Sequence, residues 1–147
     1  MKENLLEEKV ETLFEALKKR YRKNTKVQCP AFENEPIHIN TIFWKHLKYQ
    51  KNKRNRTVKD LHQRLISLDI MFDILKTVPY YQDYFLGKDK NNIIHFWTIL
   101  VIVNHVRYGI IIRKMGKQGN KHLYSIIPNW KGYIPRVDAS EYKIKIQ

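Results

Sequence analysis

The spacing of the apolar residues changes once along this chain, and this change limits the fold more than any other feature. Up to residue 78, apolar side chains such as Leu61, Leu65 and Leu68 recur every three or four residues, which is the period of a helix buried on one face. From residue 93, the apolar runs are short, rich in β-branched and aromatic residues and separated by turn residues. This order predicts an α+β fold, with N-terminal helices followed by an antiparallel sheet of about four strands.

The helical half contains three predicted helices. Between the first two, residues 27–40 are interrupted by two prolines, which predicts an extended connector. The helices are expected over 4–23, over 42–50 with Thr41 as its cap, and over 57–78, where Thr57 and Asp60 form a capping-box-like start and Pro79 ends the helix.

The second half predicts three strands and an optional fourth. Residues 116–120 contain two glycines and are expected to form a hairpin loop, whereas residues 80–92 are expected to form an aromatic turn region. The strands are expected over 93–104, 106–115 and 122–128, with the alternating tail 142–146 as a further edge strand.

Alternation along two of these strands places the polar residues on defined faces. Arg107 and Arg113 share a face of their strand with Ile111. In the last strand, regular alternation would separate Ser125 from His122, so that only one of the two would face a shared cleft. A serine on the core side of a sheet is usually hydrogen-bonded without a catalytic role, and this interpretation is favoured for Ser125.

The length and the apolar content favour one domain over 1–147, with an N-terminal helix and connector over 1–36 and a core over 37–147.

The longest apolar run, at 93–103, has eleven residues, whereas a membrane span needs about 20. We therefore expect a soluble, cytoplasmic protein with no membrane partner. Its single cysteine, Cys29, is expected to be inert.

The net charge is +14 and is unevenly distributed. Residues 1–16 carry five glutamates and two lysines, so their net charge is −3 and that of the remaining 131 residues is +17. Residues 36–59 and 90–137 contain seven and eight lysines or arginines and no acid. Such a surface attracts polyanions, and nucleic acid is the default partner because binding releases counterions from the phosphates.

The residue types suit RNA cleavage without a metal or another cofactor. We find no phosphate-binding glycine loop, and no pair of the six histidines has a zinc-ligand spacing. Cleavage of RNA through its own 2′-hydroxyl needs a base, an acid and cations around the phosphate. His46 is the best single candidate, because it lies between Lys45 and Lys48 at the end of a predicted helix. The alternative is a surface histidine on a helix that contacts nucleic acid.

Nine cations are expected to bind the nucleic acid. Six lie in the basic stretch 43–57 and three in the sheet half, and unpaired surface charges would produce the same pattern. They are Lys45, Lys48, Lys51, Lys53, Arg54, Arg56, Arg107, Arg113 and Lys121.

The order of these features over roughly 38–130 resembles the class of toxin and phage nucleases that groups barnase-like, EndoU-like, colicin-tRNase-like and Rel-type folds. The resemblance lies in "FWKHL", the basic linker, "DLHQRLISLDIMFDIL" and the strands "FWTILVIV", "VRYGIIIRKM" and "KHLYSIIPNW". It implies an RNA cleft on a curved sheet and metal-independent cleavage that leaves a 2′,3′-cyclic phosphate. The helix 1–23 is not part of the common core of that class.

The resemblance also implies roles for individual residues. The helix histidine corresponds to His46, the helix arginine to Arg64 and the polar group of a late strand to Ser125. Arg64 is then expected to hold a phosphate and Ser125 to orient the scissile group. For the second histidine or basic residue, His122, Lys121 and Arg113 remain open choices.

Three hypotheses follow. The first is a metal-independent endoribonuclease of toxin or phage type that cleaves RNA, tRNA included, and has an acidic immunity or antitoxin protein as a second partner. If it is a fragment of a toxin, it would act after delivery into the cytoplasm of a target cell. The alternative is a non-catalytic nucleic-acid-binding protein, such as a phage-encoded regulator or inhibitor. The third is an interaction module whose basic face binds an acidic protein.

Overall fold

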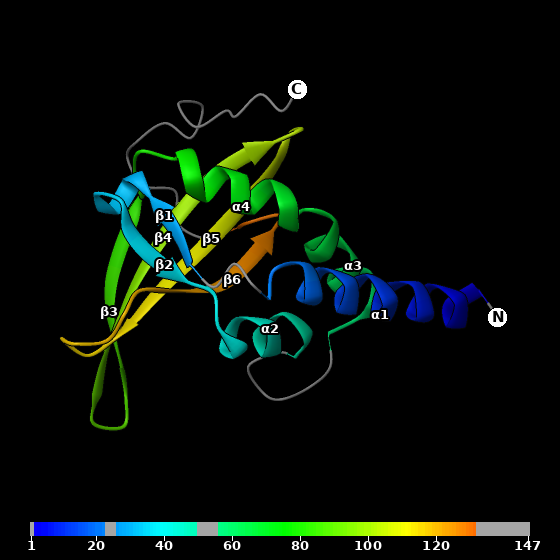
Figure 1. Ribbon diagram of the computed structural model, residues 1–147, viewed down its shortest axis with the longest axis horizontal. Coiled ribbons are helices and arrows are strands. Elements are labelled where there is room, and N and C mark those ends of the chain that lie inside the picture. Colours follow the sequence, from blue (N-terminus) through cyan, green and yellow to red (C-terminus); the bar gives the residue numbers. More distant parts are fainter. Residues whose placement is uncertain (1, 23–25, 50–55, 132–147) are drawn as a thin grey trace.

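The computed structural model describes residues 2–22, 26–49 and 56–131, and it confirms the α+β class (Figure 1). Within this part of the chain, four α-helices and one short 3-10 helix accompany a six-stranded sheet. In chain order the elements are α1 (Lys2–Arg20), β1 (Lys26–Cys29), η1 (Pro30–Phe32), β2 (Glu35–His38), α2 (Thr41–Lys48), α3 (Val58–Ile66), α4 (Leu68–Thr77), β3 (Asp83–Asp89), β4 (Asn92–Val103), β5 (Val106–Met115) and β6 (His122–Pro128).

The prediction of about four antiparallel strands is wrong in number and in one pairing. The strand order is β1-β2-β6-β5-β4-β3, and the expected strands β4, β5 and β6 pair antiparallel as predicted. The connector 27–40 contributes the two additional strands β1 and β2, which form an antiparallel hairpin. β2 joins the sheet through one parallel pair, His38 with His122. Pro30 in the connector does not prevent this hairpin, because it starts the turn η1, where a missing N–H costs nothing.

The segment predicted as an aromatic turn is instead strand β3, which pairs with β4 along its whole length. Most of β3 is exposed, including Tyr84, Phe85 and Leu86, so it lacks the buried alternation that identifies a strand in a sequence. Figure 1 shows the β3–β4 hairpin extending beyond the rest of the sheet.

The predicted helix 57–78 is two helices, α3 and α4, which meet at Ser67. The Ser67 hydroxyl donates to the main-chain oxygen of Arg64 at 3.0 Å, and this bond replaces helical pairing at the end of α3. The break lets α3 pack on α1 while α4 packs on β1.

The starts of α2 and α3 are set by side-chain caps. Thr57 caps α3 as predicted, since its Oγ1 accepts from the Asp60 N–H at 3.2 Å. For α2 the expected cap Thr41 is wrong by one residue: Asn40 Oδ1 accepts from the Ile42 N–H at 3.1 Å.

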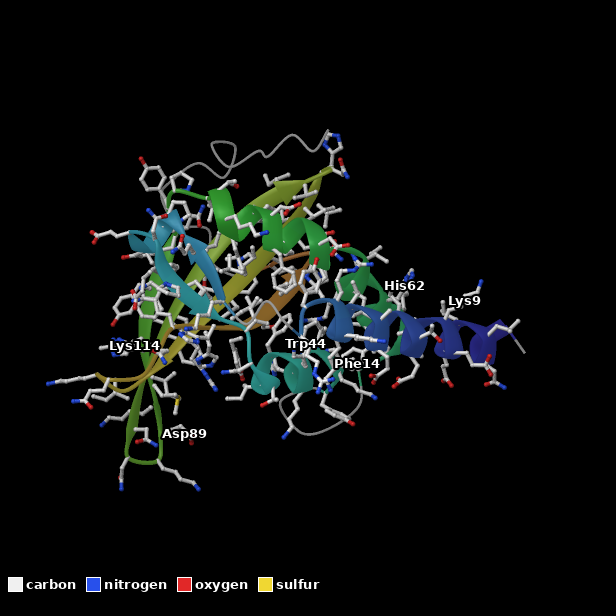
Figure 2. All side chains as sticks on the ribbon, in the orientation of Figure 1. Lys9, Phe14, Trp44, His62, Asp89 and Lys114 are labelled. Carbon is white, nitrogen blue, oxygen red and sulfur yellow. The ribbon has the colours of Figure 1, made fainter. Side chains whose placement is uncertain are left out.

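One cluster of buried apolar residues runs from Val10 in α1 to Ile126 in β6. The sheet contributes fully buried isoleucines at Ile99, Ile110 and Ile112. Phe14 of α1 packs edge-on against Trp44 of α2, with ring centroids 6.1 Å apart (Figure 2). The N-terminal half of α1 projects past the sheet, and Leu5 and Leu6 there are exposed (Figure 1).

Candidate active site

A β-bulge in β6 gathers the polar residues of this strand on one face. Ser125 pairs with Ile111 and Leu123 pairs with Ile112, which leaves Tyr124 as the extra residue. His122 pairs with Arg113, which alternates onto the same face of β5 as residue 111. The prediction that His122 and Ser125 face opposite ways is therefore wrong, because regular alternation stops at the bulge.

Four side chains meet on this face of the sheet and form what we call the histidine–arginine cluster. The ring of His46, at the end of α2, stacks on Tyr124 with centroids 4.3 Å apart and planes 18° apart. The guanidinium carbon of Arg113 lies 4.2 Å from the centroid of the same tyrosine ring. Arg113 Nε donates to His122 Nε2 at 3.2 Å. Two imidazoles from distant parts of the chain are thus connected through Arg113 and Tyr124.

Arg56 holds the end of α2, and with it the backbone of His46. Its Nε donates to the main-chain oxygen of Leu47 at 3.0 Å, and its Nη2 donates to that of His46, also at 3.0 Å. These carbonyls have no partner within the helix, so the guanidinium takes the place of a C-terminal cap. Arg56 Nη1 also lies 3.4 Å from Asp60 Oδ2 in α3.

Arg64 joins α3 to the bulged strand. It is buried, and its Nε donates to Asp60 Oδ1 at 3.1 Å. Its Nη1 donates to the main-chain oxygen of Ile126 at 2.6 Å and lies 3.4 Å from Ser125 Oγ. Nε and Nη1 of Arg64 and the hydroxyl oxygen of Ser125 are therefore engaged inside the protein, next to the cluster rather than in it.

Burial and nearby arginines keep both imidazoles of the cluster neutral. Burial, followed by the charges of Arg56, Arg64 and Arg113, lowers the pKa of His46 to about 4. Burial and the Arg113 charge also lower the pKa of His122. Since His122 Nε2 accepts from Arg113, the proton of the neutral His122 ring belongs on Nδ1. Each neutral ring has one nitrogen able to accept a proton.

The remaining predicted cations are spread over the molecule. Lys45 is exposed on α2, whereas Lys48 forms an ion pair with Glu11 at 3.0 Å. Lys121 binds Glu35 and lies over the ring of Trp97, with its nitrogen 5.0 Å from the ring centroid.

One further predicted cation, Arg107, lies away from the cluster. Arg107 is six residues from Arg113 along β5, so about 20 Å separates the two along the strand. Lys51, Lys53 and Arg54 lie outside the described residues.

Sequence reasoning missed two residues of this region. Tyr124 was not among the predicted site residues, and nothing in a single sequence marks the bulge that places it between His46 and Arg113. His38 becomes a neighbour of His122 only through the parallel pairing of β2 with β6, which joins segments 84 residues apart.

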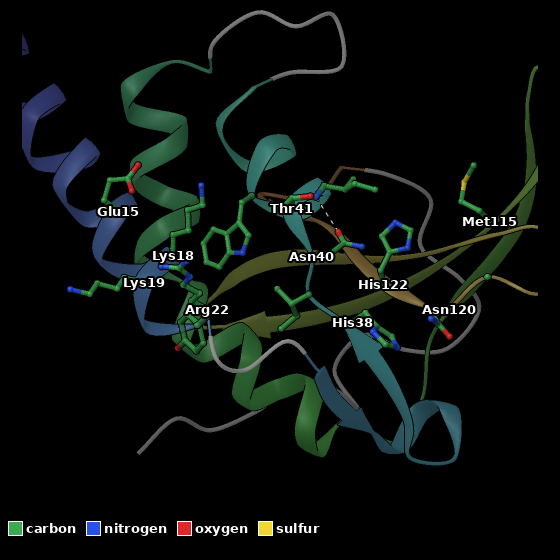
Figure 3. A pocket seen from close by; sticks show the side chains of 15 residues that line it. Glu15, Lys18, Lys19, Arg22, His38, Asn40, Thr41, Met115, Asn120 and His122 are labelled. Carbon is green, nitrogen blue, oxygen red and sulfur yellow. Dashed lines mark hydrogen bonds between the residues drawn. The ribbon is translucent and has the colours of Figure 1, made fainter.

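Next to the cluster lies a cleft of about 1010 Å³, with His122 in its wall (Figure 3). No group of three or more His, Cys, Asp or Glu side chains in the described part of the chain is placed to hold a metal ion. Among the described helices, none is both long and apolar enough to span a membrane.

Comparison with known proteins identifies no relative: no family model matches the chain, and no significant match was found among curated proteins or solved structures.

Proposed function

We propose that the protein is a metal-independent endoribonuclease in which His46 and His122 transfer protons and Arg113 binds the scissile phosphate. The observation that carries this proposal is the histidine–arginine cluster, in which one guanidinium lies between two neutral imidazoles. General acid–base catalysis by positioned groups and electrostatic stabilisation of the phosphate are the main contributions such a site can make.

Both proton transfers of the reaction can be assigned to these two histidines. The RNA 2′-oxygen attacks the adjacent phosphorus while neutral His46 takes the 2′-hydroxyl proton. The bond from phosphorus to the 5′-oxygen breaks, and protonated His122 gives its proton to that oxygen. The products are a 2′,3′-cyclic phosphate and a 5′-hydroxyl end.

Arg113 couples phosphate binding to the protonation of His122. In the free protein its Nε donates to His122 Nε2, the nitrogen that would carry the catalytic proton. A phosphate bound by Arg113 draws this donor away and adds negative charge next to the ring. Both effects favour protonated His122, so the acid forms when substrate is bound.

Arg56, Arg64 and Ser125 are assigned positioning roles in this proposal, because their polar groups are engaged within the protein. This differs from the expectation that the two arginines hold phosphates and that Ser125 orients the scissile group. The exposed Lys45 remains a candidate for backbone phosphates.

The direct test is incubation with total RNA, with and without EDTA, followed by identification of the new ends. We expect cleavage to persist in EDTA and to leave cyclic phosphates. His46→Ala should lower the rate by about a hundredfold or more, since a general base contributes at least this much. The matched control is His105→Asn, which replaces an exposed turn histidine at φ 66° with a residue that tolerates this conformation.

Cleavage that survives in a folded His46→Ala protein would refute the assignment of the base. The alternative, a non-catalytic nucleic-acid-binding protein, draws on the same basic surface and predicts salt-sensitive binding to RNA with no new ends in either buffer.

A further inference from the structure

The cleft of about 1010 Å³ extends well beyond the histidine–arginine cluster. It lies between the C-terminal end of α1, the start of α2 and the start of β6 (Figure 3). Its volume is at the upper end of the range for sites that bind small molecules. The cluster shares only His122 with it, so the rest of its lining has no role in the mechanism above.

One end of the cleft is cationic. Lys18 and Lys19 of α1 and Arg22, just after it, line it there, and Glu15 is the only acid among the described lining residues. The side chains of Lys19 and Arg22 make no hydrogen bond or ion pair within the described part of the chain. Figure 3 shows these three cations on one side and His122 on the other. An anionic group bound at this end would meet donors that are not already paired.

The position of α1 at the cleft is held by contacts to α4. Arg20 Nη1 lies 2.9 Å from Asp69 Oδ2, and the Tyr21 hydroxyl bonds the same carboxylate. The Phe14–Trp44 contact holds the adjoining part of α1 against α2. The cationic end is therefore fixed relative to the rest of the cleft.

The wall between the two ends is apolar with polar groups at its edge. Ile39 and Trp44 line it and are otherwise buried. Asn40 uses its Oδ1 to cap α2, which leaves its amide N–H groups to donate into the cleft. His38 lies at the same edge as the register partner of His122. A flat heterocycle with donors and acceptors on its rim fits such a wall.

We propose that this cleft binds one nucleotide unit, with its phosphate among Lys18, Lys19 and Arg22 and its base against Trp44 and Ile39. In an RNA strand this unit would lie beside the scissile phosphate, because His122 belongs to both the cleft and the cluster; this part rests on the proposed function. A free mononucleotide carries the same phosphate and base, and the experiment distinguishes it from a nucleotide unit of an RNA strand.

The experiment measures binding without cleavage, using a mixed-sequence RNA hexamer in which every 2′-hydroxyl is methylated, adenosine 5′-monophosphate and inorganic phosphate as probes. The test variant is Lys18→Ala/Lys19→Ala/Arg22→Ala. The control variant, Lys9→Ala/Lys59→Ala/Lys76→Ala, removes the same charge at exposed sites outside the cleft. All substituted residues are exposed, and urea midpoints verify that both variants fold.

In the test variant we expect hexamer affinity to fall on the order of tenfold at about 0.15 M salt. The slope of log K against log[salt] should become shallower by about 0.7, because the one phosphate bound in the cleft loses its cationic partners. The control variant should keep both values close to those of the unmodified protein. If the hexamer binds more tightly than the mononucleotide, the ligand of the cleft is an RNA strand. If the mononucleotide binds more tightly, the ligand is a free nucleotide.

Equal losses in both variants for every probe would overturn the proposal, and so would binding of inorganic phosphate as tight as that of the mononucleotide. A second measurement uses the ring signals of His38 and His122 in NMR spectra. The mononucleotide should shift them in the unmodified protein and not in the test variant. Because neither measurement involves cleavage, a protein that binds through this cleft without cutting RNA refutes the proposed function alone.

Discussion

At the scale of single residues, the neutral imidazole of His46 is the property on which its role depends. Its ring is partly buried against Tyr124, and the positive charges of Arg56, Arg64 and Arg113 act on it. A base with a pKa of about 4 is fully available at neutral pH, although it is a weaker proton acceptor than an ordinary histidine.

The first prediction concerns this pKa. An NMR titration of the His46 ring should give a value of about 4, and Arg113→Gln should raise it because one of the repelling charges is removed. His105, which lies in an exposed turn, serves as the reference signal in the same spectra. A His46 value close to 6.5 in the unmodified protein would contradict the described environment.

The second prediction concerns Arg64. Arg64→Ala leaves the buried main-chain oxygen of Ile126 without this donor, and an unsatisfied buried acceptor costs about 1–3 kcal/mol. Urea unfolding measures the change. Lys59→Ala, an exposed site on the same helix, should change stability by about 0.5 kcal/mol or less. A similar small effect of Arg64→Ala would show that the bonds to Asp60 and Ile126 do not hold α3 to the sheet.

At the scale of elements, the site lies where two helices end and one strand has a β-bulge. His46 lies in the last turn of α2, where Arg56 binds two carbonyls. α3 ends at the Arg64–Ser67 break, and β6 is bulged at Tyr124. A regular helix from 57 to 78 and a regular strand from 122 to 128 would place these side chains elsewhere. The end of α2 and the bulge of β6 place His46 and Tyr124 beside the Arg113–His122 pair.

The third prediction concerns the start of α2. Asn40→Ala should lower the free energy of unfolding by about 1 kcal/mol, because it removes the cap of the Ile42 N–H. Thr41→Ala, one residue further on, is the control and should change it by much less, since the Thr41 side chain makes no capping bond in the described structure. Comparison of the two urea midpoints decides between the two caps, and a larger loss for Thr41→Ala would contradict the structure.

At the scale of the whole molecule, charge and pH act together. The chain carries +14 at neutral pH, and protonation of buried histidines at lower pH adds positive charge where arginines already lie. The folded protein therefore resists protonation of His46 more than the unfolded chain does.

The fourth prediction follows from this difference. His46 has a pKa of about 4 when folded and about 6.5 when unfolded, so the unfolded chain binds the proton first as pH falls. Its contribution to stability is complete above pH 6.5 and is lost progressively towards pH 4. His46→Asn should show a shallower loss over this window in urea midpoints measured from pH 7 to 4. Identical pH profiles would contradict the lowered pKa.

Much of the fold could be predicted because its signals are local. The helical spacing at 61–75, the capping residue Thr57 and the β-branched runs at 93–104 and 106–115 each reflect the period or the termini of one element. The shared face of Arg107 and Arg113 also follows from alternation within one strand. The basic character of the chain after residue 16 depends on composition alone.

The amino-acid sequence by itself thus determined the order of helices and strands, the central antiparallel pairing and the candidate residue His46. Only the tertiary structure decided that β2 lies beside β6, that Tyr124 is a bulge, and that Arg56 and Arg64 hold the backbone. The physical reason is that these features depend on contacts between distant segments. An arginine has the same local pattern whether it faces a phosphate or a carbonyl oxygen, and only the folded neighbours distinguish the two.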